Sequence, residues 1–303
     1  MAKKNSKLMI VFAAIALAAY GCRQFTSNET ADTTNATTRS AESGHAGKAA
    51  QETAPAGDRD QGAYECPRWV RTGTAEQMLN RMAYTVSYNS ERLTPNWVGW
   101  VLTAAHTDGS FSIWNRHAVA SHRLGAFRTE DRPRHDVNPF VADIREGECG
   151  YQRGHMCPAG DNKWSYKAQK EAFLMTNICP QNGDLNQRDW KYLEEACRDW
   201  ASKYGKIYIV SGPVFRSKNP QTVGEHEVSV PDAFFKVVLT LGKKQDTPKS
   251  IGFIYNNVEG RHKMEYYARS VDEVEKMTGL NFFSHLDDKV ENRIEAECDL
   301  GSW

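Results

Sequence analysis

The sequence has no net charge and no long apolar run, and each absence excludes a class of protein. Its 38 basic residues balance 38 acidic ones, so no overall positive field attracts a polyanion. A nucleic-acid site would therefore depend on a local cluster of cations. The apolar run at residues 8–20 spans only 13 residues, whereas a membrane-spanning helix needs about 20. The composition, with 40% hydrophobic and 25% charged residues, is that of a soluble globular protein.

Residues 1–22 have the pattern of an export signal. Three lysines precede the short apolar run, and the small residues Ala19 and Gly21 stand where a signal peptidase cuts. Cys22 follows at once, which predicts a lipoprotein signal, a lipid on Cys22 and a place at the membrane of a cell envelope. Ala19 replaces the leucine usual in such signals. The alternative is an ordinary secretory signal and a secreted or periplasmic product.

Residues 23–63 have hardly any aromatic side chains and are rich in Ser, Thr, Ala, Gly, Asn and Gln. Such a segment cannot bury enough apolar surface to fold, so it is expected to be a flexible tether. The folded domain is expected over residues 64–303, which is long enough for one large domain.

The cysteine count is compatible with disulfides in an exported protein. Of seven cysteines, six remain if Cys22 carries a lipid, and six allow up to three bridges. A zinc site is the rival interpretation, with the ligands Cys149, His155, Cys157 and Cys179. Their C-x5-H-x-C spacing fits no common zinc module.

Strand-like and helical segments alternate in the expected domain. Aromatic and β-branched residues predict strands at 82–88, 97–104, 207–211, 233–241 and 251–255. Helical patterns cover 165–173, 187–204, 271–278 before Gly279, and 284–296. Hairpin-like strand pairs interrupted by helices predict an α+β fold with a largely antiparallel central sheet flanked by helices.

The helix expected at 187–204 carries one apolar stripe, formed by Trp190, Leu193, Cys197, Trp200, Ala201 and Tyr204. Glu194 lies at the edge of this stripe and Arg198 just beyond it. Because they are four residues apart, they can pair on one face. This helix alone favours an ordinary surface ion pair.

Two polar segments suggest chemistry. Arg153 and His155 are separated by one glycine, so in an extended segment both side chains share a face and can reach one ligand. Asn177 and Asn186 stand in polar turns before the long helix. Eight helical residues rise about 12 Å, so if the helix includes Asn186, then Asn186 and Glu194 cannot both ligate one ion directly. A hydrated Mg²⁺ would resolve this, because it keeps several of its waters.

These segments resemble the sugar-non-specific DNA/RNA endonuclease family of the ββα-metal class. The likeness rests on R-G-H at 153–155, T-N-x-x-P-Q at 176–181 and L-N-x-x-x-W-x-x-L-E from Leu185. It continues through 211–215, 230–236 and 270–280, and covers roughly residues 82–286.

The resemblance implies a Mg²⁺-dependent phosphodiester hydrolase acting on DNA and RNA, with Mn²⁺ as a substitute and products carrying 5′-phosphates. His155 would be the general base, and Asn186 the direct metal ligand. Glu194 would hold metal-bound water, and Arg153 and Arg198 would stabilise charge on the phosphate. Asn177 matches a position that supports the site.

One residue departs from the family pattern: Gln152 stands where the family usually has aspartate before R-G-H. Loss of this carboxylate should weaken control of the metal's waters. The alternative function is therefore a catalytically weakened nucleic-acid-binding envelope lipoprotein.

Substrate binding is expected to involve the basic stretch at residues 116–135, which holds five arginines and three histidines. Arg128 and Arg123 are its candidates for phosphate contact, and a solvated basic loop is the alternative. Asp161 lies close enough to the R-G-H motif to be a further candidate. Contacts to the nucleic-acid backbone carry no base information, which is typical of non-specific cutting.

Overall fold

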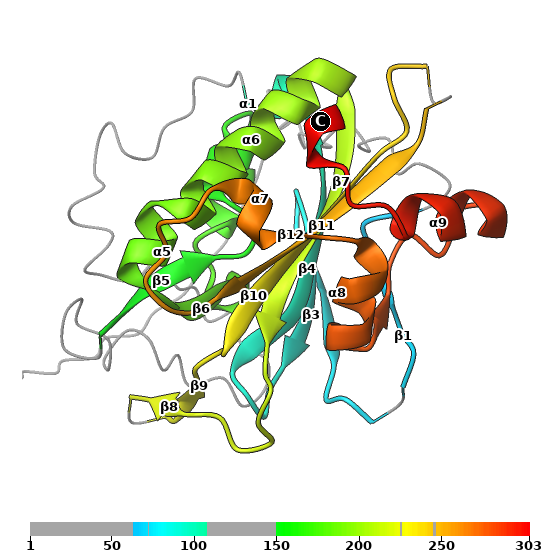
Figure 1. Cartoon of the computed structure of the whole chain (residues 1–303). Helices are drawn as coiled ribbons and strands as arrows, with labels where there is room; N and C mark the ends of the chain where they lie inside the picture. Colours follow the sequence, from blue (N-terminus) through cyan, green and yellow to red (C-terminus); the bar gives the residue numbers. More distant parts are fainter. Residues whose placement is uncertain (1–62, 72, 108–149, 225, 245–246) are drawn as a thin grey trace, which may run out of the picture. The chain divides into compact units, whose positions relative to one another are not determined.

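The computed structural model describes residues 63–71, 73–107, 150–224, 226–244 and 247–303 (Figure 1). The expected signal segment, nearly all of the expected tether, Cys149, Arg123 and Arg128 lie outside these ranges. Within them, no helix is long and apolar enough to cross a membrane.

A seven-stranded sheet forms the centre of the domain, in the order β12-β11-β10-β7-β4-β3-β2. Every neighbouring pair in it is antiparallel. The strands are β2 (Gln77–Asn80), β3 (Thr85–Asn89), β4 (Thr94–Thr103), β7 (Lys206–Val214), β10 (Ala233–Thr240), β11 (Lys249–Asn256) and β12 (Ala268–Arg269). The antiparallel sheet and its helices confirm the predicted fold class.

Helices cover both faces of this sheet, and each face buries a hydrophobic core. Helix α6 (Asp189–Tyr204) packs on one face, and α8 (Val271–Thr278) and α9 (Asp288–Glu295) pack on the other (Figure 1). Strand β10 serves both cores, because successive side chains of a strand point to opposite faces. Phe234 and Val238 lie in the core under α6, and Phe235 and Val237 in the core under α8.

A separate two-stranded unit carries the R-G-H motif. Strand β5 (Tyr151–His155) pairs antiparallel with β6 (Ile178–Asn182), and α5 (Gly183–Gln187) and α6 follow directly. Between the two strands the chain forms the short helices η3 (Ala159–Asn162), α4 (Tyr166–Glu171) and η4 (Met175–Asn177). The order strand, strand, helix is the ββα unit that the resemblance implies.

The remaining elements are short. Two further strand pairs are β1 (Arg68–Trp69) with β13 (Leu280–Asn281), and β8 (Thr222–Val223) with β9 (Val228–Ser229). Within the described ranges the other helices are α1 (Ala104–Thr107), α7 (Met264–Tyr267) and η5 (Leu300–Ser302).

Several predicted boundaries were wrong. The helix expected at 187–204 begins only at Asp189, because Arg188 leaves helical geometry with φ −122° and ψ −90°; Gln187 ends the separate helix α5, which was not predicted. Asn186 therefore lies in α5 rather than in a turn, and Glu194 lies on the separate helix α6. The strand expected at 82–88 begins only at Thr85, and the helix expected at 284–296 begins only at Asp288.

Other predictions about local structure are confirmed. Helix α8 begins with a capping box between Ser270 and Glu273, and ends at Gly279 in the left-handed conformation with φ 74°. In α6 the predicted stripe is buried from Trp190 to Ala201.

The cysteines do not form the three bridges considered from the sequence. Cys157, Cys179 and Cys197 are buried free thiols, and Cys298 is an exposed one. Burial raises the pKa of all three buried thiols, which keeps them protonated at neutral pH. A thiolate is the form that attacks a disulfide, so these thiols are also poorly reactive.

Candidate active site

Strand β5 presents Arg153 and His155 on one face, as the spacing predicts. Both side chains are half-buried, and His155 packs edge-on against Phe173 with ring centroids 5.0 Å apart. Gly154 points to the other face, toward Gln181. A Cβ atom at Gly154 would collide with the Gln181 side chain, approaching its Cβ to 2.7 Å. The glycine of the R-G-H motif is therefore required by this close approach.

Asn177 fixes the chain just after His155. Its side-chain Oδ1 accepts a hydrogen bond from the Cys157 backbone N–H at 2.9 Å, and its Nδ2 donates to the carbonyls of Cys157 and Ala172. Its own backbone carbonyl accepts from Met156 N–H at 3.0 Å. Asn177 is fully buried, so all these bonds are shielded from water. These bonds fix the backbone at the end of β5, directly after His155.

Gln152 and Asn186 are hydrogen-bonded to each other. Asn186 Nδ2 donates to Gln152 Oε1 at 2.9 Å, which joins α5 to β5. Because the side-chain N–H group of Asn186 makes this bond, its carbonyl oxygen points away from Gln152. Oxygen is the ligand atom that Mg²⁺ prefers, so the Oδ1 atom of Asn186 is still available to bind a metal. Gln152 thus orients Asn186, but it supplies no negative charge.

Arg198 pairs with Asp161, a residue of η3. The distance from Arg198 Nη1 to Asp161 Oδ1 is 2.9 Å, and Asp161 Oδ2 also accepts from Trp100 Nε1 at 3.1 Å. Burial raises the pKa of Asp161 even though Arg198 opposes the shift. Burial alone would lower the pKa of Arg198, but the Asp161 carboxylate outweighs it and the pKa is raised. The guanidinium therefore stays charged and is held against Gly160, whose Cβ would lie 3.0 Å from Nη1.

Glu194 lies one turn before Arg198 on α6 and forms a charged cluster with Arg198, Asp161 and Lys236. Burial, with help from Asp161, raises the pKa of Glu194 to about 7, while Lys236 and Arg198 oppose the shift. The carboxylate is thus balanced between its two protonation states near neutral pH. A nearby cation would favour the charged form.

Lys236 is the buried cation beneath Glu194. Its side chain is fully buried on β10, with Nζ 4.5 Å from the centre of the Trp190 ring and 5.3 Å from that of Trp100. Among the described residues Nζ has no hydrogen-bond partner. Two aromatic faces and two nearby carboxylates therefore stabilise a charge that burial would otherwise penalise.

The zinc interpretation gains no support. In the parts of the chain that the structure describes, the only group of three or more His, Cys, Asp or Glu residues with metal-ligand spacing is Asp272, Glu275 and Glu295. That group lies on α8 and α9, far along the sequence from His155, Cys157 and Cys179.

A comparison with known protein families decides the identity. Residues 68–289 match the family described as DNA/RNA non-specific endonuclease. The chain belongs to this family. Its members are metal-dependent nucleases, and the protein is accordingly a nuclease.

Individual relatives agree with this assignment. The nuclease is 30% identical over 266 residues to "Nuclease EXOG, mitochondrial" of Xenopus laevis, covering 83% of this chain and 69% of the relative. It is also 30% identical over 235 residues to a nuclease of a Nostoc strain, covering 73% of this chain and 78% of the relative.

A solved structure confirms the fold. The chain of the EndoG/EndoGI complex, described as showing the mechanism of EndoG inhibition, superposes with a TM-score of 0.60 at 22% identity. The match covers 73% of the nuclease and 91% of that chain. At this identity the likeness shows the shared ββα-metal fold alone.

Two residues of the nuclease's charged cluster were not assigned roles from the sequence. Asp161 was only a candidate near the R-G-H motif, and its pairing with Arg198 joins residues 37 positions apart. Lys236 did have a local signal, because it is a single charge within the apolar strand 233–239. A lysine at a position flanked by buried residues on both faces indicates a buried charge with a specific environment.

Proposed function

We propose that the protein is an exported, Mg²⁺-dependent endonuclease that hydrolyses phosphodiester bonds of DNA and RNA, with His155 as the general base. The observation that carries the proposal is the ββα unit, in which α5 packs against β5 and β6 and Asn186 is bonded to Gln152. This unit joins the strand of Arg153 and His155 to the helix of the metal-ligand candidate.

Each residue has a task that suits its chemistry. His155 would take a proton from the attacking water, for which an imidazole with an unperturbed pKa of about 6.5 is suited at neutral pH. Arg153 and Arg198 would bind the phosphate oxygens, because a guanidinium donates two parallel hydrogen bonds to such a group. Asn177 and Asp161 would hold the backbone after His155 and the Arg198 side chain in place.

Asn186 would hold the metal through Oδ1, and Glu194 would accept hydrogen bonds from water in its surroundings. Mg²⁺, or Mn²⁺ as a substitute, supplies Lewis-acid stabilisation of charge on the phosphate and the leaving oxygen. The donors fit such an ion, since an amide oxygen and a carboxylate are hard oxygen ligands.

The test is cleavage of plasmid DNA and of RNA by the full chain, with Mg²⁺ or with EDTA. His155→Ala should lower the cleavage rate by about 10²–10⁴-fold, the usual contribution of a general base. His262→Ala is the matched control, because His262 is an exposed histidine stacked on Tyr266 at 4.1 Å, outside the charged cluster. Equal cutting by both variants would show that the base lies elsewhere.

Gln152 supports a second candidate function, a nucleic-acid-binding protein with weakened turnover. It leaves the position beside Asn186 without a carboxylate. Tight, salt-sensitive binding of DNA in Mg²⁺ without any cleavage would favour this function over the nuclease.

Export and lipid attachment are proposed from the sequence of residues 1–22. Mass spectrometry of the N-terminal peptide from the membrane fraction tests this directly. A lipid on Cys22 that is lost in Cys22→Ser, together with release of the protein from membranes, would support the anchor. An unmodified N-terminus after residue 22 would support ordinary secretion instead.

A further inference from the structure

Three carboxylates of α8 and α9 lie close together. Both helices pack on the sheet face opposite α6 (Figure 1). One oxygen from each of Asp272, Glu275 and Glu295 lies within 4.8 Å of the other two. Asp272 and Glu275 are three residues apart on α8 and so share one face of that helix. Glu295 is the last residue of α9.

Glu295 is the member of this group that requires an explanation. Its side chain is only 4% exposed, and its Oε1 has no hydrogen-bond partner among the described residues. A buried carboxylate oxygen without a partner is unfavourable, because it has lost water and gained nothing in return. The neighbouring oxygens of Asp272 and Glu275 are also acceptors, so in their ionised forms they repel it.

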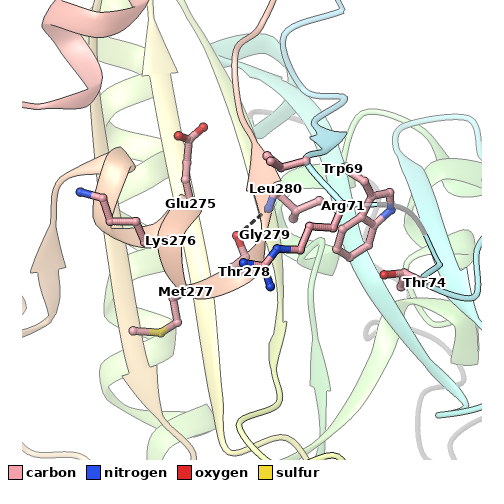
Figure 2. A pocket seen from close by; sticks show the side chains of 10 residues that line it. Trp69, Arg71, Thr74, Glu275, Lys276, Met277, Thr278, Gly279 and Leu280 are labelled. Atoms are coloured by element: carbon pink, nitrogen blue, oxygen red, sulfur yellow. Dashed lines mark hydrogen bonds between the residues drawn. The ribbon is translucent and has the colours of Figure 1, made fainter.

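The surroundings offer little positive charge to balance the cluster. Glu291, one turn before Glu295, adds a further carboxylate, and the neighbouring basic residue Lys276 is exposed. Figure 2 shows the Glu275 carboxylate directed away from Arg71, which lines the adjacent cavity between α8 and β1. The backbone N–H of Phe282 does donate to Glu275 Oε1 at 2.7 Å, which fixes that side chain in place.

Burial and mutual repulsion disfavour negative charge on these carboxylates. Burial, followed by the neighbouring acids, raises the pKa of Glu275 to about 7 and that of Glu295 to about 9. Without a counter-charge the cluster must take up protons near neutral pH.

The spacing of the oxygens fits a metal ion. Three atoms no more than 4.8 Å apart can all lie within about 2.8 Å of one central point, so a small movement of the side chains brings them to the Ca²⁺–oxygen distance of about 2.3–2.6 Å. Asp272 and Glu275 are half-buried, so water can complete the coordination on their side. Ca²⁺ accepts 6–8 oxygens in flexible geometry, whereas Mg²⁺ demands a near-ideal octahedron. We propose that Asp272, Glu275 and Glu295 form a structural Ca²⁺ site that joins α8 to α9, separate from the nuclease site.

Calcium binding to the metal-stripped full chain tests this proposal. The measurement is titration calorimetry with Ca²⁺ alone, carried out in an Asn186→Ala background so that the proposed Mg²⁺ ligand is absent. We expect one bound Ca²⁺ per chain and none in Glu295→Gln. At saturating Ca²⁺ the unfolding temperature should rise by about 5 °C, since an ion that binds only the folded state stabilises it.

Glu297→Gln is the matched control, because Glu297 is an exposed acid two residues further along, paired with Arg293 at 4.0 Å. It should keep both the bound Ca²⁺ and the thermal shift. If Glu295→Gln does not fold, Glu275→Gln, at a half-buried position, replaces it.

Two results would overturn the proposal: no Ca²⁺ bound at millimolar concentration, or Ca²⁺ binding that Glu295→Gln leaves unchanged. If the wild-type chain binds no Ca²⁺ and Glu295→Gln raises the unfolding temperature, the carboxylates are neutralised by protonation instead of by a metal ion. Cleavage of DNA in Mg²⁺ should stay within about twofold of wild type in Glu295→Gln, because α9 lies on the face opposite α6. The two proposals can therefore fail independently.

Discussion

Replacing Asp161 with asparagine tests whether a buried ion pair positions Arg198. The change keeps the shape of the side chain and removes its charge. The side chain of Asp161 is 1% exposed and that of Arg198 is 22% exposed, so the burial of this ion pair is intermediate between that of a fully buried pair and that of a surface pair. We expect Asp161→Asn to lower both the free energy of unfolding and the cleavage rate.

The magnitude follows from this position. Removing one partner of a fully buried pair costs about 3–5 kcal/mol, and exposed pairs contribute about 0–1 kcal/mol. Arg198 can reach water after the change, and the asparagine oxygen can still accept from Trp100 Nε1. Burial also raises the pKa of Asp161, so the carboxylate already carries a desolvation penalty that asparagine avoids. The expected loss is therefore about 2 kcal/mol.

The assay is urea unfolding combined with steady-state cleavage of DNA in Mg²⁺. A loss of about 2 kcal/mol should accompany a 10–100-fold fall in kcat, because a misplaced phosphate-binding group disturbs the reacting geometry. Glu195→Gln is the control on the same helix, since its pair with Lys191 is exposed and spans 3.6 Å. It should change stability by less than about 0.5 kcal/mol.

A double-mutant cycle with Arg198→Met separates the two effects, since residues in contact should be coupled. Stability and kcat of Asp161→Asn equal to those of Glu195→Gln would refute the reasoning. A fall in stability with unchanged kcat would refute the positioning role alone.

Three further outcomes are expected. Gln152→Leu removes the hydrogen bond to Asn186 and should lower the apparent affinity for Mg²⁺ in cleavage by about 10–100-fold, measured as a higher midpoint in a Mg²⁺ titration. Gln152→Asp should not lower this affinity. Asn177→Leu leaves buried backbone groups without partners and should lower the free energy of unfolding by about 3 kcal/mol in urea; a loss below about 1 kcal/mol would contradict its clamping role. In Ca²⁺-free buffer, the raised pKa of Glu295 should stabilise the fold fully below about pH 4.5, and this contribution should be lost as the pH rises toward 9. Glu295→Gln should make the free energy of unfolding less dependent on pH over this range. A wild-type free energy of unfolding that increases over the same range would contradict the assigned direction.

How much of this site can be read from the sequence depends on how local each contact is. The buried stripe of α6 was predictable, because Trp190, Leu193 and Cys197 repeat with the period of one helix. The split at Arg188 was not, since no proline or glycine marks it. Arg198 was expected to pair with Glu194, its neighbour on the helix, but its ion pair is with Asp161.

The Asn186 contact shows the same limit. Gln152 was recognised as a departure from the family, but its bond to Asn186 spans 34 residues and depends on how α5 folds back on β5. Sequence periodicity describes one element at a time, and therefore says little about side chains that meet between elements.

The three buried thiols give the nuclease a built-in reporter of its own motions. Cys157 follows the strand of His155, Cys179 lies opposite Gly154, and Cys197 lies on α6 between Glu194 and Arg198. A thiol reagent cannot reach any of them while α6 stays on the sheet, so their labelling rates measure how often this half of the domain opens. Cys298 is exposed, so its labelling does not depend on such opening and serves as the reference rate. The opening of the chain could thus be followed by mass spectrometry without introducing any new cysteine.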